Sequence, residues 1–289
     1  MKIIKFLAVS FSLVFLSCKE AKSQEKELLI QNKIENKKSI INPEGKTLKT
    51  RFETPEGFER IKVQKNSFGD YLQNLPLKPH GAIVKYYNSD NKWNKDVYHA
   101  VVDLKIGKKD LHQCADAVMR LRAEYLWNQK KYDSIHFNFT NGFRVDYSKW
   151  MEGNRIGIKG NKTWWKKSAK PSNTYENFWK YMEQVFTYAG TASLSKELKS
   201  VSVKDLKIGD VFIQGGFPGH AIIVVDVAIN PKTKEKLFML AQSYMPAQET
   251  QILQNLENPK RSPWYSLEHA NRLYTPEWSF DKTDLKRFK

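Results

Sequence analysis

One cysteine and one histidine occupy positions from which they could act as a nucleophile and its base. Cys114 lies in "DLHQCADAVMRLRAEYL", whose apolar residues recur at spacings of three and four and predict an amphipathic helix beginning at about Leu111. Asp110 with Gln113 fits a capping box at its start. Unsatisfied N–H groups in a first helical turn lower the pKa of a thiol, and the thiolate is the reactive form. The sequence therefore predicts a nucleophilic Cys114; the alternative is that Cys114, which falls on the apolar stripe, is a small buried side chain without reactivity.

His220 opens the unbroken apolar run "HAIIVVDVA" and follows the turn "GGFPG". A general base needs a rigid mount, and the first residue of a central strand supplies one. The stretch "LKIGDVFI" predicts a strand before it, and "KLFMLAQSYM" predicts a strand after it. We therefore expect three consecutive antiparallel strands, with His220 facing Cys114.

This order of a cysteine helix, a "GD" strand, a histidine strand and a third strand with a polar residue resembles the papain-like exported cysteine hydrolases. It is most similar to the NlpC-type and CHAP-type peptidoglycan peptidases and amidases, over about a third of the domain. The resemblance implies Cys114 as nucleophile, His220 as base and Gln242 as the residue that orients the imidazole. Asp226 is the weaker choice for the third role, because six residues of strand place it about 20 Å from His220.

The long spacing between Cys114 and Gly209 predicts an insertion with a second helix, opened by Asn173 with Glu176 and closed at Gly190. We also expect a hairpin formed by "GAIVKYYN" and "DVYHAVVDLKI". The tail 246–282 is rich in Pro and aromatic residues, and we expect it to wrap the sheet as irregular structure without chemistry.

The first residues have the layout of a secretory signal, with Lys2 and Lys5 beside an apolar run that ends in Ser17-Cys18. The ending "VFLSC" resembles a bacterial lipoprotein signal, which implies lipid attachment at Cys18. We expect a signal peptide over 1–18, a polar tether over 19–50 and one α+β domain over 51–289, papain-like, with an antiparallel sheet packed against the Cys-bearing helix. The protein is then exported and lipid-anchored to the cell envelope, in the periplasm or at the outer membrane; the leaflet and the oligomeric state stay open.

The chain is strongly basic, with 48 Lys and Arg against 31 Asp and Glu and a formal charge of +17. Export argues against a nucleic-acid partner, so we expect a solvated basic surface suited to cell-wall or other anionic envelope polymers. The histidines are scattered, and neither H-E-x-x-H nor a P-loop occurs. No metal and no cofactor are expected.

Two further stretches could bind a ligand. "KGNKTWWKKSAK" carries Trp164 and Trp165 among lysines, and exposed aromatic rings beside cations stack on sugars or grip anionic polymers. The commoner alternative is a mobile basic loop with one Trp packed inward. Arg144 and Trp150 in "GFRVDYSKW" could line a cleft, or could form an ion pair with Asp146 and a core contact.

The sequence thus predicts an envelope-anchored cysteine hydrolase, an amidase or peptidase acting on peptidoglycan peptides. The alternative is a non-catalytic envelope lipoprotein that binds glycan or a protein partner, and a third is an inactive member of the hydrolase fold. The whole chain also resembles an uncharacterised family of exported lipoproteins whose domain has no assigned function.

Overall fold

The computed structural model describes residues 39–289 of the chain. Cys18, the signal segment and most of the predicted tether lie outside the described residues. Residues 40–289 form one compact unit, whose first helix, α2 (Leu48–Arg51), buries Leu48 completely. The folded unit therefore starts before residue 51, the boundary expected from composition, because Leu48 and Phe52 contribute apolar side chains to its core.

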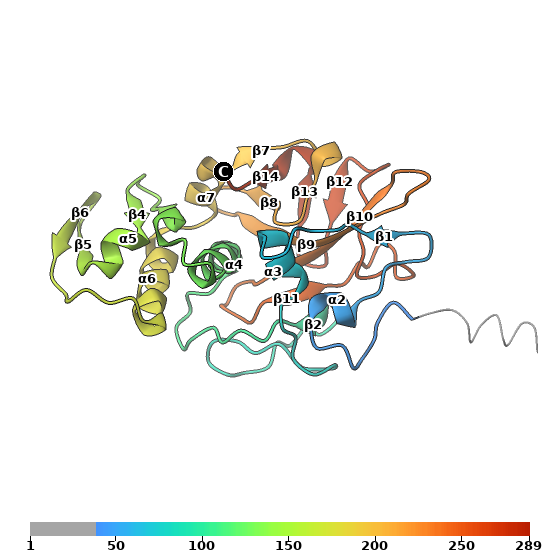
Figure 1. Ribbon diagram of the computed structural model, residues 1–289, viewed down its shortest axis with the longest axis horizontal. Helices are drawn as coiled ribbons and strands as arrows, with labels where there is room; N and C mark the ends of the chain where they lie inside the picture. The colour runs from blue at the N-terminus through green and yellow to red at the C-terminus, as the bar shows by residue number, and fades with distance from the viewer. Residues whose placement is uncertain (1–38) are drawn as a thin grey trace, which may run out of the picture. The chain divides into compact units, whose positions relative to one another are not determined.

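The core of the unit is an antiparallel sheet of eight strands, which confirms the predicted mixed α+β class with a large antiparallel sheet (Figure 1). Its order from one edge is β2 (Tyr98–Val101), β11 (Gln251–Leu253), β10 (Lys236–Gln242), β9 (His220–Ile229), β8 (Val211–Gln214), β14 (Leu285–Arg287) and β7 (Lys199–Ser200), and β1 (Glu59–Arg60) pairs with the far end of β9. The consecutive antiparallel strands β8, β9 and β10 confirm the prediction for this segment.

Strand β9 is apolar from Ala221 to Val225 because both faces of the sheet are covered there. Ile223 and Val225 belong to a core that includes residues of the long helix α4 (Cys114–Asn128). Ile222 and Val224 belong to a second core, which the C-terminal part of the chain supplies. A strand with two buried faces has no solvent side on which polar residues could alternate.

Helix α3 (Phe68–Gln73) and helix α4 both contact β9. The predicted insertion follows α4 and holds η1 (Tyr132–Ser134), β3 (His136–Asn138), β4 (Arg144–Asp146), α5 (Tyr147–Met151), β5 (Asn154–Lys159), β6 (Lys162–Lys167), α6 (Tyr175–Tyr188) and α7 (Thr191–Glu197). Helix α6 confirms the second predicted helix; its N-cap is Thr174, whose side chain accepts the N–H of Asn177. The basic tract around Trp164 forms the β5–β6 hairpin and is not a structureless loop.

The hairpin predicted for 81–106 is wrong. Strand β2 pairs with β11, from the far end of the chain, and residues 81–88 contribute only isolated bridges. Val84 and Val97 still bury each other in a small core, so the apolar pattern was real while the pairing partner was not local.

The irregular structure predicted for the tail is also wrong in part. Besides β11, the C-terminal segment forms β12 (Arg272–Tyr274), β13 (Ser279–Asp281), η3 (Lys282–Asp284) and β14. The remaining short helix, η2 (Val203–Asp205), lies before β8. Leu273, Phe280 and Leu285 cover the second face of the sheet, and this burial orders the segment.

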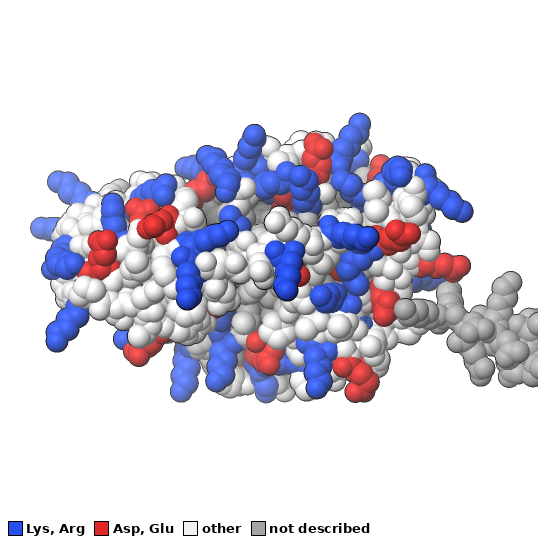
Figure 2. All heavy atoms as spheres, in the orientation of Figure 1, with Lys and Arg blue, Asp and Glu red and all other residues white. Residues whose placement is uncertain are grey.

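Lys and Arg side chains predominate among the charged groups on the face drawn in Figure 2, in keeping with the basic composition. Within residues 39–289, no helix combines the length and the apolar character that a bilayer crossing requires.

Candidate functional site

Cys114 is the first residue of α4, and Gln113 is its N-cap. The carboxylate of Asp116 accepts the backbone N–H of Gln113 at 3.0 Å, so the cap lies three residues beyond the predicted pair of Asp110 and Gln113. Asp110 instead accepts the Gln113 side-chain amide and, at 2.6 Å, the N–H of Ala247. These bonds hold the start of α4 against the loop that follows β10.

The thiol of Cys114 lies against the start of β9, where the backbone N–H of Ala221 interacts with the sulfur. Burial raises the pKa of the Cys114 thiol to about 11, and the nearby Asp116 adds to the rise. The N–H groups of Ala115 and Ala221 lower the pKa by less. The N–H groups of the helix start thus lower this pKa as expected, but desolvation of a residue only 8% exposed outweighs their contribution.

His220 is 1% exposed, and its Nε2 lies 2.9 Å from Oε1 of Gln242 on the neighbouring strand. The imidazole packs among the rings of Tyr244, Trp278 and Phe280, at centroid distances of 5.0, 5.4 and 5.9 Å. Burial lowers the pKa of His220 to about 4, the charge of Lys92 lowers it further and the bond to Gln242 opposes the shift. The imidazole is therefore neutral at neutral pH.

A glycine is required immediately before His220, because the backbone at Gly219 packs closely against the preceding loop at Gly216 and against α7 at Thr191. A Cβ added to Gly219 would lie 2.6 Å from the carbonyl oxygen of Gly216 and 2.6 Å from Oγ1 of Thr191. The same Thr191 hydroxyl donates to the Gly216 carbonyl at 3.1 Å. The turn thus delivers His220 to the strand end at a fixed position.

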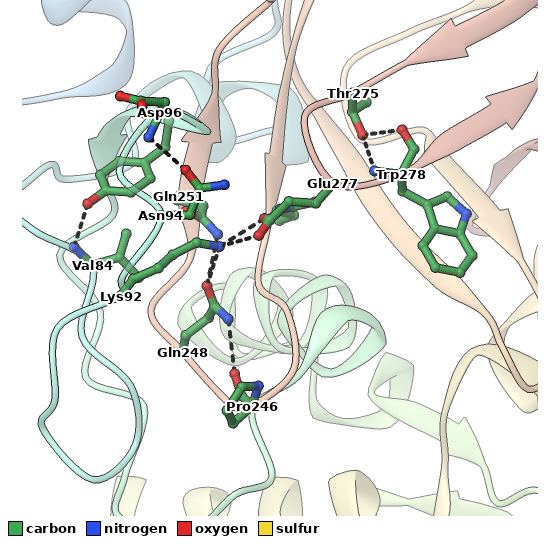
Figure 3. A network of polar contacts seen from close by, with 12 residues as sticks. Val84, Lys92, Asn94, Asp96, Pro246, Gln248, Gln251, Thr275, Glu277 and Trp278 are labelled. Carbon is green, nitrogen blue, oxygen red and sulfur yellow. Dashed lines mark hydrogen bonds and ion pairs between the residues drawn. The ribbon is translucent and has the colours of Figure 1, made fainter.

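A buried polar network extends from Gln242 to the opposite loops, and Figure 3 shows its part around Lys92 and Glu277. The side-chain N–H of Gln242 donates to Glu277 at 2.6 Å, and Glu277 pairs with Lys92 at 2.8 Å. Lys92 also donates to Gln248 at 2.9 Å, so two acceptors from separate segments converge on one ammonium group. Lys92 is 2% exposed, and burial lowers its pKa while Glu277 opposes that shift.

This network determines the tautomer of His220. A carboxylate only accepts hydrogen bonds, so Glu277 directs the amide N–H of Gln242 toward itself and the amide oxygen toward Nε2 of His220. Nε2 must then carry the proton, and Nδ1 is the ring nitrogen left to accept one.

The structure brings His220 and Gln242 into direct contact at the start of β9, where His220 packs against Phe280 of the second core. Cys114 lies beside Ala221, in the core that α4 covers. Among residues 39–289, no hydrogen bond joins the thiol to the imidazole. Both reactive groups are nearly closed to solvent in this state.

The other polar residues of the motif stretches have structural partners. Asp210 of the "GD" turn is buried and pairs with Arg287 of β14 at 2.6 Å. Asp226 accepts from Arg60 at 2.6 Å and from Gln73 at 2.7 Å. The side chain that bonds to His220 is thus Gln242.

The four residues considered for ligand binding lie apart from this site, in the insertion. Trp164 is 43% exposed and covers Gly157, whereas Trp165 packs against Phe143. Arg144 pairs with Asp146 at 2.7 Å, and Trp150 is buried with its indole N–H donating to Asn177. Figure 1 shows β5 and β6 at the opposite end of the insertion from β9.

Sequence reasoning missed Lys92, Tyr244, Glu277 and Trp278, which surround His220 and Gln242. Lys92 and Glu277, for example, are 185 residues apart in the chain, and a local pattern carries no signal for such a meeting. Within residues 39–289, no group of three or more His, Cys, Asp and Glu side chains is arranged to hold a metal ion.

Comparison with known families places these features in context. A family model described as "Domain of unknown function (4846)" matches residues 48–287, nearly the whole folded unit, which confirms the expectation of a domain without an assigned function. No curated protein and no solved structure matches the chain. The resemblance to NlpC-type and CHAP-type hydrolases continues to rest on the motifs alone. The chain belongs to the family of domain of unknown function 4846.

Proposed function

We propose that this domain is a cysteine hydrolase of the papain-like kind, with Cys114 as nucleophile, His220 as base and Gln242 as the residue that positions the base. The observation that carries the proposal is the 2.9 Å bond between Nε2 of His220 and Oε1 of Gln242, one residue before Ala221, whose backbone N–H interacts with the Cys114 sulfur. A base whose far nitrogen is held by an oriented acceptor is the arrangement that nucleophilic catalysis requires.

In the proposed reaction, the thiol proton passes to Nδ1 of His220 while the sulfur attacks the carbonyl carbon of an amide. Backbone N–H groups at the start of α4 stabilise the oxyanion. The C–N bond then breaks, and the imidazolium gives its proton to the leaving amine. Water attacks the thioester with His220 as base, which releases the acid and restores the thiol.

The pKa values of the resting groups make this a general-base mechanism. Because the pKa of the Cys114 thiol is about 11 and that of the His220 imidazole is about 4, the proton is on the sulfur in the resting state. Proton transfer must therefore accompany attack, after substrate brings thiol and imidazole into contact, because hydrogen bonds of this kind often tighten only in the complex.

Peptidoglycan stem peptides are the substrate class we propose, on the basis of the motif resemblance and the compartment. The same proposal includes export and lipid attachment at Cys18, which would hold the domain at the envelope beside that polymer. Its basic surface suits an anionic polymer.

The test is release of new amino groups from purified cell-wall fragments, with intact-mass detection of an acyl adduct. We expect Cys114→Ala to abolish both signals and His220→Ala to lower kcat/KM by about 10²- to 10⁴-fold. Glu277→Gln, which frees the Gln242 amide to rotate, should lower kcat more than it raises KM. His269→Ala, at an exposed histidine far along the chain, is the matched control and should leave turnover unchanged.

Two results would refute the hydrolase. Cleavage that survives Cys114→Ala would place the chemistry elsewhere. Fragments that bind saturably without cleavage, with binding lost on Trp164→Ala, would favour the alternative of a glycan-binding lipoprotein, for which the half-exposed Trp164 on the lysine-rich hairpin is the supporting observation.

A further inference from the structure

A cavity of about 400 Å³ lies between the C-terminal half of α4, the β3–β4 hairpin, the end of α7 and the residues after β14. It is separate from the site around His220: Arg122, on its wall, follows Cys114 by eight residues, or about 12 Å of helix. The volume far exceeds that of one water molecule, for which about 30 Å³ suffices. The cavity can therefore admit a small organic molecule.

Arg122 is the unusual residue of this cavity. The chain has nine arginines, all within the described residues, and eight of them donate hydrogen bonds to carbonyl, hydroxyl or carboxylate oxygens. Arg122 donates none to any residue of 39–289, and no Asp or Glu side chain there pairs with it.

Aromatic rings hold the Arg122 guanidinium in place. Its central carbon lies 5.1 Å from the ring of Phe68, 5.4 Å from that of Phe288 and 5.7 Å from that of Tyr125. Rings attract the cation but accept no conventional hydrogen bond from its five N–H groups. The result is a fixed, half-buried cation whose donors have no acceptor among residues 39–289 and which the cavity exposes.

The other charged residues of the cavity make it positive. Arg144, Lys196 and Lys289 add three cations, and Glu197 is the one acidic side chain in its wall. Glu197 is itself engaged, because it accepts the N–H of Asn138 at 2.7 Å, and burial raises its pKa. Arg144 keeps its bond to Asp146 at the rim.

We propose that this cavity is a binding site for a small molecule bearing an oxyanion, a carboxylate or a phosphate, with the Arg122 guanidinium as its fork-shaped primary donor. Guanidinium groups bind both oxyanions through paired N–H donors, and Lys196 and Arg144 at the rim supply further charge. The inference is independent of the hydrolase proposal, because it uses no residue of that site.

The test is calorimetric titration of the purified chain with inorganic phosphate and, separately, with acetate, in a low-salt buffer without other oxyanions. We expect saturable binding of at least one anion at millimolar concentrations. Arg122→Gln should weaken binding about tenfold or more, and Lys196→Gln should weaken it by a smaller factor. Lys166→Gln, which removes an exposed charge from the β5–β6 hairpin, is the matched control and should bind as the unaltered chain does.

If phosphate binds and acetate does not, the ligand is a phosphoryl compound. If acetate also binds, the site takes a carboxylate. Because Arg122 also packs between rings, its variant is checked by circular dichroism, and the exposed Lys196 supplies a second test that does not disturb the core. No saturable binding, or binding that Arg122→Gln and Lys196→Gln both leave unchanged, overturns the proposal. Cys114→Ala should retain anion binding whether or not the domain is a hydrolase.

Discussion

At the scale of single residues, the environment of Cys114 matters more than its place in the sequence. A helix start lowers the pKa of a thiol through N–H groups worth tenths of a kcal/mol up to about 2 kcal/mol. Burial of the Cys114 thiol and the neighbouring Asp116 raise its pKa, and their combined effect exceeds that of the N–H groups. In the resting state the Cys114 thiol and the His220 imidazole are both neutral, and the two do not form a thiolate–imidazolium pair.

Alkylation should reveal this neutral pair. In the Cys18→Ala chain, labelling of Cys114 by iodoacetamide should be slow at pH 7 and should rise as the pH approaches about 11, where the thiolate forms. The same chain unfolded in urea should show the ordinary thiol profile, with its midpoint near 9. A rate already at its plateau at pH 6, and lowered by His220→Ala, would demonstrate an ion pair and contradict this account.

At the scale of elements, the loop before β9 determines where His220 lies. Gly219 is surrounded by the Gly216 carbonyl and the Thr191 hydroxyl, so the loop and α7 are packed without room for a methyl group. A shift there would displace His220 from Gln242, since His220 is the next residue in the chain.

Gly219→Ala should therefore lower the free energy of unfolding by about 1–3 kcal/mol, as overpacking does, and should impair hydrolysis if the domain is a hydrolase. Urea titration measures the stability. Gly190→Ala is the matched control, because a Cβ at Gly190 meets nothing within 4 Å and the backbone there is extended, with φ −178°. An unaltered unfolding midpoint for Gly219→Ala would show that the loop relaxes freely.

At the scale of the whole molecule, the sheet needs the two ends of the folded chain. Strand β14 lies between β8 and β7. Strand β1, which comes early in the folded unit, pairs with β9. Arg287 of β14 pairs with the buried Asp210. Residues that follow the catalytic candidates by more than forty positions thus complete the sheet that carries them.

Leu285→Ala tests this closure. Leu285 is fully buried on β14, and its truncation should cost about 2–5 kcal/mol of unfolding free energy, lowering the urea midpoint of the whole unit in one transition. Thr283→Ala, at an exposed position just before the strand, should leave the midpoint in place. A Leu285→Ala chain with unchanged stability would mean that the C-terminal strand is an appendage to the sheet.

The sequence by itself determined the elements whose patterns are local: helices α4 and α6, whose apolar residues recur at helical spacing, and the three strands β8, β9 and β10. It also determined the order in which Cys114, His220 and Gln242 occur along those elements. Tertiary structure alone decided the pairing of β2 with β11, the place of β14 in the sheet and the meeting of Lys92 with Glu277, because contacts between distant segments leave no periodic trace in either one. It also decided the protonation of Cys114 and left Arg122 without a hydrogen-bond acceptor among residues 39–289, since the solvation of a charge depends on which side chains the fold places around it.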